Sequence, residues 1–445
     1  MEVQKTDICI LGAGAGGLSV ASVAAQLNLK TILIEKNKMG GDCLNYGCVP
    51  SKSLLAAAKK LLIIKKAKSM GVYANDIEIK WDEVKAHVKH VIKTIEPHDS
   101  KARFESLGAE VILGSPKFVD DKTVEVNDIQ IKAKYFVIAT GSSANIVPIN
   151  GLENVHYLTN ETIFDIEEKP KHLITIGAGP IGCELSQAFR LLHSEVSIID
   201  IAKMLPIDDK ELTDIIRVQF QNDGINLYEK VQIEAISKSD NPEFPIKVTI
   251  KKNNVTKEIY GSHLLMATGR KANLEHLGLD NAKIDYSKRG ISVDHRLRTN
   301  KKYIYAIGDC IGDLQFTHMA GFHASIVIQN MFFKLPKKYK THATPWVTYT
   351  YPELAHIAPL FSELKKDSTI KILKISLKES DRAQAENETN GAIKIAVNKK
   401  GIVLAASIVS PIAGEMIYPW IMAVTQKMKL KKIIEMIPLI QHGGI

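Results

Sequence analysis

One pattern constrains the fold of this 445-residue chain more than any other, because it occurs twice. A short apolar stretch leads into a G-x-G-x-x-G loop, a helix-favouring run follows, and a second apolar stretch ends in an acid. In the first copy the glycines are Gly12, Gly14 and Gly17, and the acid is Glu35, 23 residues after the first glycine (35 − 12). The glycines of such a unit permit a tight turn and close approach to a pyrophosphate, and the acid accepts hydrogen bonds from a ribose. The pattern predicts a dinucleotide-binding unit.

The second copy has the same spacing. Its glycines are Gly177, Gly179 and Gly182, and Asp200 ends the next strand, again 23 residues after the first glycine (200 − 177). Because one dinucleotide needs one such unit, two copies predict two different dinucleotides. An acid at this position favours a free ribose 2′-hydroxyl, so we expect NADH. Lys203 lies nearby and keeps NADPH as the less favoured alternative.

A stretch with two cysteines, GGDCLNYGCVPSK, lies between the two units. Pro50 and the apolar run after it predict a helix start, which places Cys48 just ahead of a helix N-terminus and Cys43 one loop back. Backbone N–H groups and the helix dipole favour a thiolate there. The spacing favours a redox-active disulfide, while a structural disulfide and half of a metal site are the alternatives. We predict no metal site, since a zinc ion would need two more ligands at short spacing and the sequence offers no such pair.

Composition narrows the class of protein. The apolar share of 45% and the charged share of 24% are typical of a soluble globular protein, and the length predicts two to four domains. The net charge of +9 comes mostly from scattered lysines without aromatic residues between them, so we expect a solvated surface and no nucleic-acid partner. No apolar run reaches the ~18 residues that span a bilayer. We expect a cytoplasmic protein without a membrane span.

Taken together, these features resemble the class I pyridine nucleotide–disulfide oxidoreductases, a family that includes dihydrolipoamide dehydrogenase, glutathione reductase and mercuric reductase. The cysteine stretch carries the resemblance, and two glycine-ended strands (135–141 and 264–269), the strand IYAIGD and the triplet FTH extend it over nearly the whole chain. The resemblance implies an α/β fold with two Rossmann-like dinucleotide-binding domains and a C-terminal α+β interface domain that makes a homodimer. We expect an FAD-binding domain at 1–145 and 265–342, an NAD(P)-binding domain at 146–264 and a dimerisation domain at 343–445.

The resemblance also implies roles for single residues. Cys48 would be the charge-transfer thiol over the flavin, and Cys43 the interchange thiol that attacks the substrate. Lys52 would lie next to flavin N5 and pair with Glu184. From the residues alone, a lysine at a helix start such as Lys52 is usually a solvated charge, and Glu184 could be an acid favoured by the helix dipole. The residues implied to bind FAD or the pyridine nucleotide are Gly12, Gly14, Gly17, Glu35, Lys36, Gly41, Lys52, Thr140, Gly141, Gly177, Gly179, Gly182, Asp200, Gly269, Asp309, Thr317 and His318.

The C-terminus departs from the family pattern. Family enzymes that reduce disulfides carry a His-Pro-Thr segment followed by a glutamate, whose histidine acts as general acid–base in the partner's active site. This sequence reads IPLIQHGGI at its end, and His442 lacks the following Pro-Thr and glutamate. A mercuric reductase would also carry a C-terminal cysteine pair, which is missing. We therefore expect the dimerisation domain to be incomplete, through truncation or through altered chemistry.

The predicted function is that of an FAD-dependent NAD(P)H:disulfide oxidoreductase, most like dihydrolipoamide dehydrogenase. Electrons would pass from NADH through FAD to the cysteine pair, and from there to a small-molecule or protein-bound disulfide. The alternatives are a mercuric-reductase-like enzyme, a diaphorase or quinone reductase, and a catalytically impaired flavoprotein kept as a binding or scaffold subunit.

Overall fold

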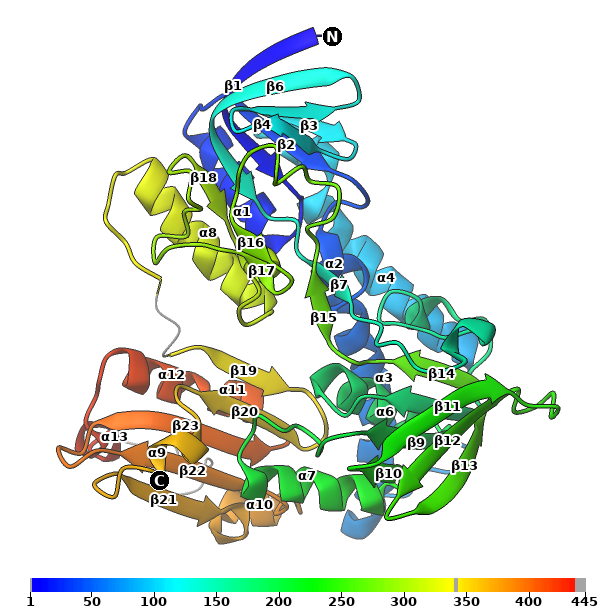
Figure 1. Ribbon diagram of the computed structural model, residues 1–445. Coiled ribbons are helices and arrows are strands. Elements are labelled where there is room, and N and C mark those ends of the chain that lie inside the picture. The colour runs from blue at the N-terminus through cyan, green and yellow to red at the C-terminus, as the bar shows by residue number, and fades with distance from the viewer. Residues whose placement is uncertain (1, 340–342, 437–445) are drawn as a thin grey trace. The chain divides into compact units, whose positions relative to one another are not determined.

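The computed structural model describes residues 2–339 and 343–436, and the chain forms two compact units (Figure 1). The first unit comprises Met1–Ser53, Lys85–Asn145 and Gly269–Lys340, and the second comprises Leu54–Val84, Ile146–Thr268 and Thr341–Ile445. The three expected domains stay a prediction, because the second unit contains both Ile146–Thr268 and Thr341–Ile445, together with Leu54–Val84. Helices α3 (Cys48–Ala67) and α4 (Trp81–Asp99) each run across a boundary between the units.

The first unit is built on a sheet with the strand order β3-β2-β1-β6-β5-β4, and β18 also pairs with β6. The strands β3, β2, β1, β6 and β18 are parallel, while β4, β5 and β6 form an antiparallel meander. Besides α3 and α4, its elements are β1 (Glu2–Leu11), α1 (Ala15–Gln26), β2 (Thr31–Glu35), α2 (Gly41–Asn45), α5 (Lys101–Ser106), β3 (Ala109–Leu113), β4 (Lys117–Asp120), β5 (Thr123–Val126), β6 (Ile129–Ile138), β7 (Ser142–Ala144), β15 (Arg270–Ala272), β16 (Tyr286–Ser287), β17 (Gly290–Ile291), β18 (Ile304–Ala306) and α8 (Thr317–Met331).

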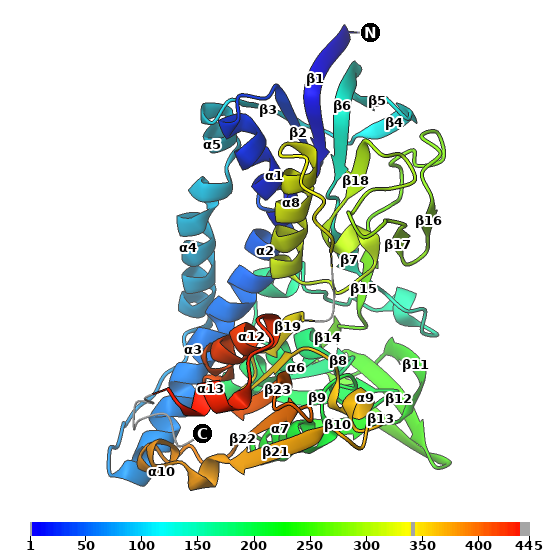
Figure 2. The same ribbon diagram turned by 90° about the vertical axis from the view of Figure 1, so that its left-hand side faces the viewer.

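Alternation along the strands explains the core of this unit. Ile8 and Ile10 of β1 pack in one apolar cluster with α1 and α8, whereas Cys9 and Leu11 pack in a second cluster on the other face. Every residue of β2 is buried, as is usual for a parallel strand covered on both faces. Figure 2 shows α1 and α8 side by side against this sheet. The carboxyl ends of β1 and β2 lead into the segments that carry the predicted site.

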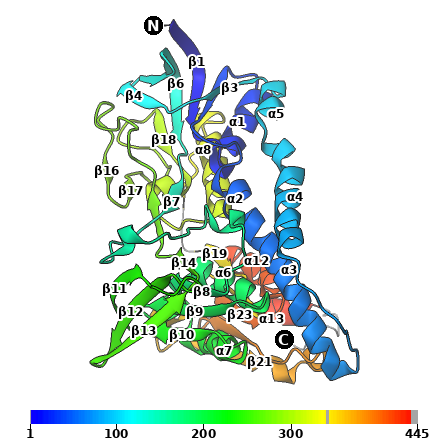
Figure 3. The ribbon, with the colours of Figure 1, turned by 90° about the vertical axis from the view of Figure 1, so that its right-hand side faces the viewer.

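The second unit repeats the parallel arrangement in a sheet of order β10-β9-β8-β14, and adds an antiparallel sheet β11-β12-β13 (Figure 3). One apolar cluster joins these two sheets. The elements are β8 (His172–Ile176), α6 (Pro180–Leu191), β9 (Glu195–Asp200), α7 (Lys210–Asn222), β10 (Asn226–Glu229), β11 (Gln232–Lys238), β12 (Ile246–Lys252), β13 (Val255–Gly261) and β14 (His263–Met266).

The C-terminal part of the second unit is a five-stranded antiparallel sheet of order β19-β20-β23-β22-β21 with short helices. Its core lies between the sheet and α9, α11, α12 and α13. The bounds are β19 (Pro345–Thr348), β20 (Glu353–Ile357), α9 (Phe361–Leu364), β21 (Lys371–Ser376), α10 (Asp381–Ala385), β22 (Ala392–Val397), β23 (Val403–Ser410), α11 (Ala413–Met416), α12 (Tyr418–Thr425) and α13 (Leu430–Ile434). None of the helices in the described ranges has the length and apolar character to cross a membrane.

Candidate active site

The first glycine loop connects β1 to α1 in the first unit. Gly12 has a φ of +107°, and a Cβ there would lie 2.4 Å from the Ala139 carbonyl oxygen. A Cβ on Gly17 would lie 1.8 Å from the Gly12 carbonyl oxygen. Helix α1 begins after Gly14 without a side-chain cap, so its first turn presents backbone N–H groups to an anion. This close-packed loop fits a dinucleotide pyrophosphate.

Glu35 stands at the end of β2, beside the same loop. Its Oε2 accepts a hydrogen bond from the Ala13 N–H at 2.7 Å, and its Oε1 accepts one from the Asn37 N–H at 2.7 Å. The buried carboxylate is thereby fixed next to the glycine loop and keeps further lone pairs for ribose hydroxyls. Lys36 follows with an exposed side chain.

The second unit reproduces this arrangement. Gly177 has a φ of +109°, and a Cβ on Gly182 would lie 2.0 Å from the Gly177 carbonyl oxygen. Helix α6 begins after Gly179, again without a side-chain cap. Asp200 accepts 2.6 Å hydrogen bonds from the Ala178 and Ala202 N–H groups. Each unit thus carries one complete dinucleotide cradle, held by the same contacts.

The cysteine segment packs against the first glycine loop. Cys43 lies within the short helix α2, and Cys48 is the first residue of α3, so the expected loop around Cys43 is a helical turn. A Cβ on Gly41 would lie 2.7 Å from the Gly14 Cα, which brings the two segments into backbone contact. The two predicted features of the first unit, the nucleotide loop and the cysteine pair, therefore meet at one place.

Both cysteines are half-buried thiols. A hydrogen bond from Cys43, the Thr317 hydroxyl and the charge of Lys52 lower the pKa of Cys48 to about 6, against the opposing effect of burial. The same shared hydrogen bond, burial and the neighbouring negative charges raise the pKa of Cys43. The Thr317 Oγ1 lies 3.4 Å from the Cys48 Sγ, at the start of α8. The two pKa values therefore shift in opposite directions, so that Cys48 loses its proton more readily than Cys43.

A charge network that the sequence did not reveal adjoins the pair. The Arg270 guanidinium lies 3.1 Å from Asp42 Oδ1 and 3.8 Å from Asp309 Oδ2, and it donates to the Ser142 side chain at 2.7 Å. Ser142 in turn donates to Asp309 Oδ2 at 2.6 Å. Burial raises the pKa of Asp309. The only sequence signal for Arg270 was its position directly after a glycine-ended strand.

The two glycine-ended strands come together in the first unit. The Thr140 hydroxyl donates to the Asn273 carbonyl at 2.8 Å, and the Asn145 N–H donates to the Gly269 carbonyl at 2.9 Å. Gly141 has a left-handed φ of +69° at the turn into β7. The predicted residues of this segment therefore lie at one sheet edge, beside the network around Asp309.

The remaining predicted residues lie on α8 and α6. His318 stacks on Phe316 with ring centroids 5.2 Å apart, next to Thr317. Glu184 is buried in α6 of the second unit, where its Oε1 accepts a hydrogen bond from the Tyr349 N–H at 2.9 Å. The pairing of Glu184 with Lys52 stays a prediction. His442 lies outside the described residues.

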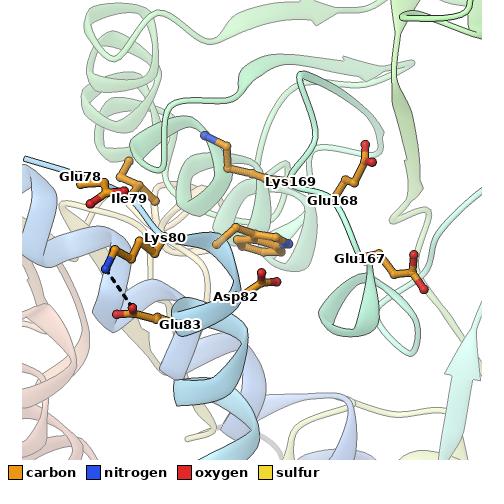
Figure 4. A pocket seen from close by; sticks show the side chains of 9 residues that line it. Glu78, Ile79, Lys80, Asp82, Glu83, Glu167, Glu168 and Lys169 are labelled. Atoms are coloured by element: carbon orange, nitrogen blue, oxygen red, sulfur yellow. Dashed lines mark ion pairs between the residues drawn. The ribbon is translucent and has the colours of Figure 1, made fainter.

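A hollow of about 550 Å³ in the second unit contains none of the predicted site residues (Figure 4). Its lining is strongly charged and includes an ion pair of 3.3 Å between Lys80 and Glu83. Among the described residues, no cluster of three or more His, Cys, Asp or Glu side chains is arranged to hold a metal ion. The thiol pair against the first glycine loop remains the candidate active site.

Two dinucleotide cradles and a cysteine pair beside the first of them define a class: flavoproteins that connect a pyridine nucleotide to a disulfide. The family model described as pyridine nucleotide-disulphide oxidoreductase matches residues 6–324, and the model of that family's dimerisation domain matches residues 344–440. The chain belongs to the pyridine nucleotide-disulphide oxidoreductase family. This membership confirms the predicted resemblance and the predicted flavin-dependent oxidoreductase class, and it implies FAD and a pyridine nucleotide.

Similar proteins carry two kinds of name. The chain is 33% identical to a mercuric reductase of Bacillus cereus over 422 residues, which is 94% of this chain and 66% of that protein. It is 31% identical to a dihydrolipoyl dehydrogenase of Chlamydia pneumoniae over 440 residues, 97% of this chain and 93% of that one.

Solved structures confirm the fold class. LpdA of Mycobacterium tuberculosis superposes with a TM-score of 0.89 at 24% identity, covering 98% of both chains. The HOCl-induced flavoprotein disulfide reductase RclA of Escherichia coli superposes with a TM-score of 0.87 at 24% identity, covering 97% of this chain and 96% of that one. The dimerisation domain also supports the predicted homodimer.

Proposed function

We propose that the protein uses NADH to reduce a disulfide, with Cys43 and Cys48 as the redox pair. The observation that carries this proposal is the place of the two cysteines: they lie in the segment whose Gly41 is in backbone contact with Gly14 of the first glycine loop, and their pKa values shift in opposite directions, downward for Cys48 and upward for Cys43. A structural cysteine pair needs neither the lowered pKa nor the contact with a nucleotide loop.

The cofactor assignments follow the two cradles. The first glycine loop, Glu35, Lys52 and Asp309 would hold FAD, and the second loop with Asp200 would hold the pyridine nucleotide. Bound FAD would supply the two-electron carrier between the nicotinamide and the cysteine disulfide. The Asp200 carboxylate, fixed at the end of β9, would accept a ribose 2′-hydroxyl and repel a 2′-phosphate, which favours NADH. By residue range, we assign 1–145 and 265–342 to FAD, 146–264 to NADH and 343–445 to the dimer interface.

The chemistry of the reduced pair is thiol–disulfide exchange. Cys43, after loss of its proton, attacks one sulfur of the substrate, forms a mixed disulfide and releases the first substrate thiol. The Cys48 thiolate then attacks the Cys43 sulfur, which releases the second substrate thiol and forms the Cys43–Cys48 disulfide. The two electrons that the substrate gains are those that the cysteine pair loses. A cysteine pair that reduces disulfides suits the cytoplasm, where thiols are kept reduced.

The identity of the substrate can be tested with a panel of electron acceptors. We would measure NADH oxidation by the flavin-loaded protein with lipoamide, glutathione disulfide, Hg(II) and a quinone, for the parent, Cys43→Ser, Cys48→Ser and a Cys9→Ala control. Hg(II) is a second candidate substrate because relatives named mercuric reductase reach the same range of identity. Disulfide reduction is expected in the parent and the control, and in neither serine variant. Turnover of the quinone alone, unaffected by Cys43→Ser, would contradict the proposal and support a diaphorase.

A further inference from the structure

Asp42 places a negative charge beside the redox pair. It lies in the first turn of α2, immediately before Cys43, and its side chain is 36% exposed. A Cβ on Gly47 would lie 2.8 Å from Asp42 Oδ2, so the carboxylate is directed across the loop between the two cysteines. A carboxylate in this position opposes the formation of a thiolate on either sulfur.

Arg270 holds this carboxylate from another part of the chain. Its side chain is only 11% exposed, and one nitrogen, Nη2, approaches both Asp42 Oδ1 at 3.1 Å and the Ser142 carbonyl at 2.9 Å. The bonds from Nε and Nη2 to Ser142 fix the guanidinium plane. The guanidinium is therefore held in place by contacts other than the one with Asp42.

We propose that Asp42 and Arg270 form a charge pair that sets the redox equilibrium of the Cys43–Cys48 pair. Asp42 disfavours the reduced, thiolate-containing form, and Arg270 limits that effect. The inference rests on the proposed function for its biological use only, since the equilibrium exists in the protein without any substrate.

Two other groups that face the sulfurs act in the direction opposite to Asp42. Lys52 of α3 and the Thr317 hydroxyl of α8 both favour the thiolate. On the far side of Arg270, Asp309 shares the guanidinium at 3.8 Å. Asp42 is therefore the group whose charge opposes Lys52 and Thr317, and loss of Arg270 would leave Asp42 and Asp309 without their shared cation.

The direction of the effect follows from the electron and proton balance. Reduction of the disulfide takes two electrons and, while Cys48 stays a thiolate, one proton. Any change that stabilises the thiolate lowers the pKa of the reduced pair and shifts the equilibrium towards the reduced form. Removal of the Asp42 charge should favour reduction, and removal of the Arg270 charge should favour oxidation. A purely structural role predicts no such opposition of sign.

The test is an anaerobic equilibration of the flavin-loaded protein with mixtures of reduced and oxidised dithiothreitol, followed by alkylation and mass spectrometry of the cysteine peptide. Dithiothreitol donates the two electrons and becomes its cyclic disulfide. Relative to the parent, Asp42→Asn should shift the equilibrium constant about threefold to tenfold towards the reduced pair, and Arg270→Gln by a similar factor the other way. The double variant should lie closer to the parent than either single variant.

Matched controls separate charge from structure. Asp42→Glu and Arg270→Lys keep the charges and should stay near the parent value. Asp294→Asn removes a carboxylate from an ion pair of 2.6 Å with Arg298 in the same unit and should change nothing. If Arg270→Gln loses its flavin, the comparison of the equilibrium constants of Asp42→Asn and Asp42→Glu still tests the inference. Equal equilibrium constants for those two, or shifts of the same sign for Asp42→Asn and Arg270→Gln, would overturn the inference, whatever the enzyme assays show about substrate.

Discussion

The hydroxyl of Thr317 offers the sharpest single test of how the thiolate is held. Its Oγ1 lies 3.4 Å from the Cys48 Sγ, and valine has the same shape without the donor. A hydrogen bond to a charged group contributes about 1.5–3 kcal/mol. Because Thr317 is exposed, water competes for the sulfur, so we assign this hydrogen bond a contribution of about 1.4 kcal/mol, which corresponds to about one pKa unit. Thr317→Val should therefore raise the pKa of Cys48 from about 6 to about 7.

The assay is the rate of Cys48 alkylation by iodoacetamide as a function of pH in the reduced, flavin-loaded protein, resolved by peptide mass spectrometry. At pH 7 the thiolate fraction should fall from about nine-tenths to about one half, with the midpoint of the profile moved upward. Thr317→Ser keeps the hydroxyl and should retain the parent midpoint. A Val variant whose midpoint equals that of the Ser variant would refute the role of this hydrogen bond.

Three further predictions concern the scaffold. Gly17→Ala, whose Cβ would lie 1.8 Å from a carbonyl oxygen, should abolish FAD retention, whereas Gly321→Ala, with no neighbour within 4 Å, should keep a full FAD-to-protein ratio. Lys394→Met leaves Asp209 buried without its 2.8 Å partner and should cost about 3–5 kcal/mol of unfolding free energy in denaturant titrations, most of it recovered with Asp209→Asn in addition. Burial raises the pKa of Asp208 to about 6, so ionisation of this carboxyl lowers the stability of the fold as the pH rises from about 4 to about 6. Asp208→Asn should therefore add about 2–3 kcal/mol to the free energy of unfolding at pH 7.5 and nothing near pH 4. A difference in thermal unfolding that does not change with pH would contradict this.

Local patterns predicted the parts of the structure that depend on local geometry. A position with a left-handed φ or a backbone contact under 3 Å requires glycine, and this requirement can be seen in the sequence, as at Gly12 and Gly177. The acids at the strand ends were visible for the same reason, because the spacing from loop to acid is fixed by one helix and one strand. The helical turn around Cys43 was missed, since α2 is too short for any periodicity to indicate.

Contacts between distant segments were beyond the reach of the sequence. Arg270 begins β15, which pairs with β7, and its side chain reaches Asp42 of α2, a residue far away in the sequence. The grouping of Leu54–Val84 with the second unit likewise depends on packing rather than on any composition change. The NADH preference and the roles of the site residues stay predictions, because they depend on bound molecules that a chain's own contacts do not describe.

The most direct test of the central claim is an anaerobic titration of the flavin-loaded protein with NADH, followed through the visible flavin spectrum. We expect a long-wavelength charge-transfer band that requires the Cys48 thiolate, present in the parent and lost in Cys48→Ser. Bleaching of the flavin in the parent without such a band would contradict it, because the cysteine pair would then lie outside the path of the electrons.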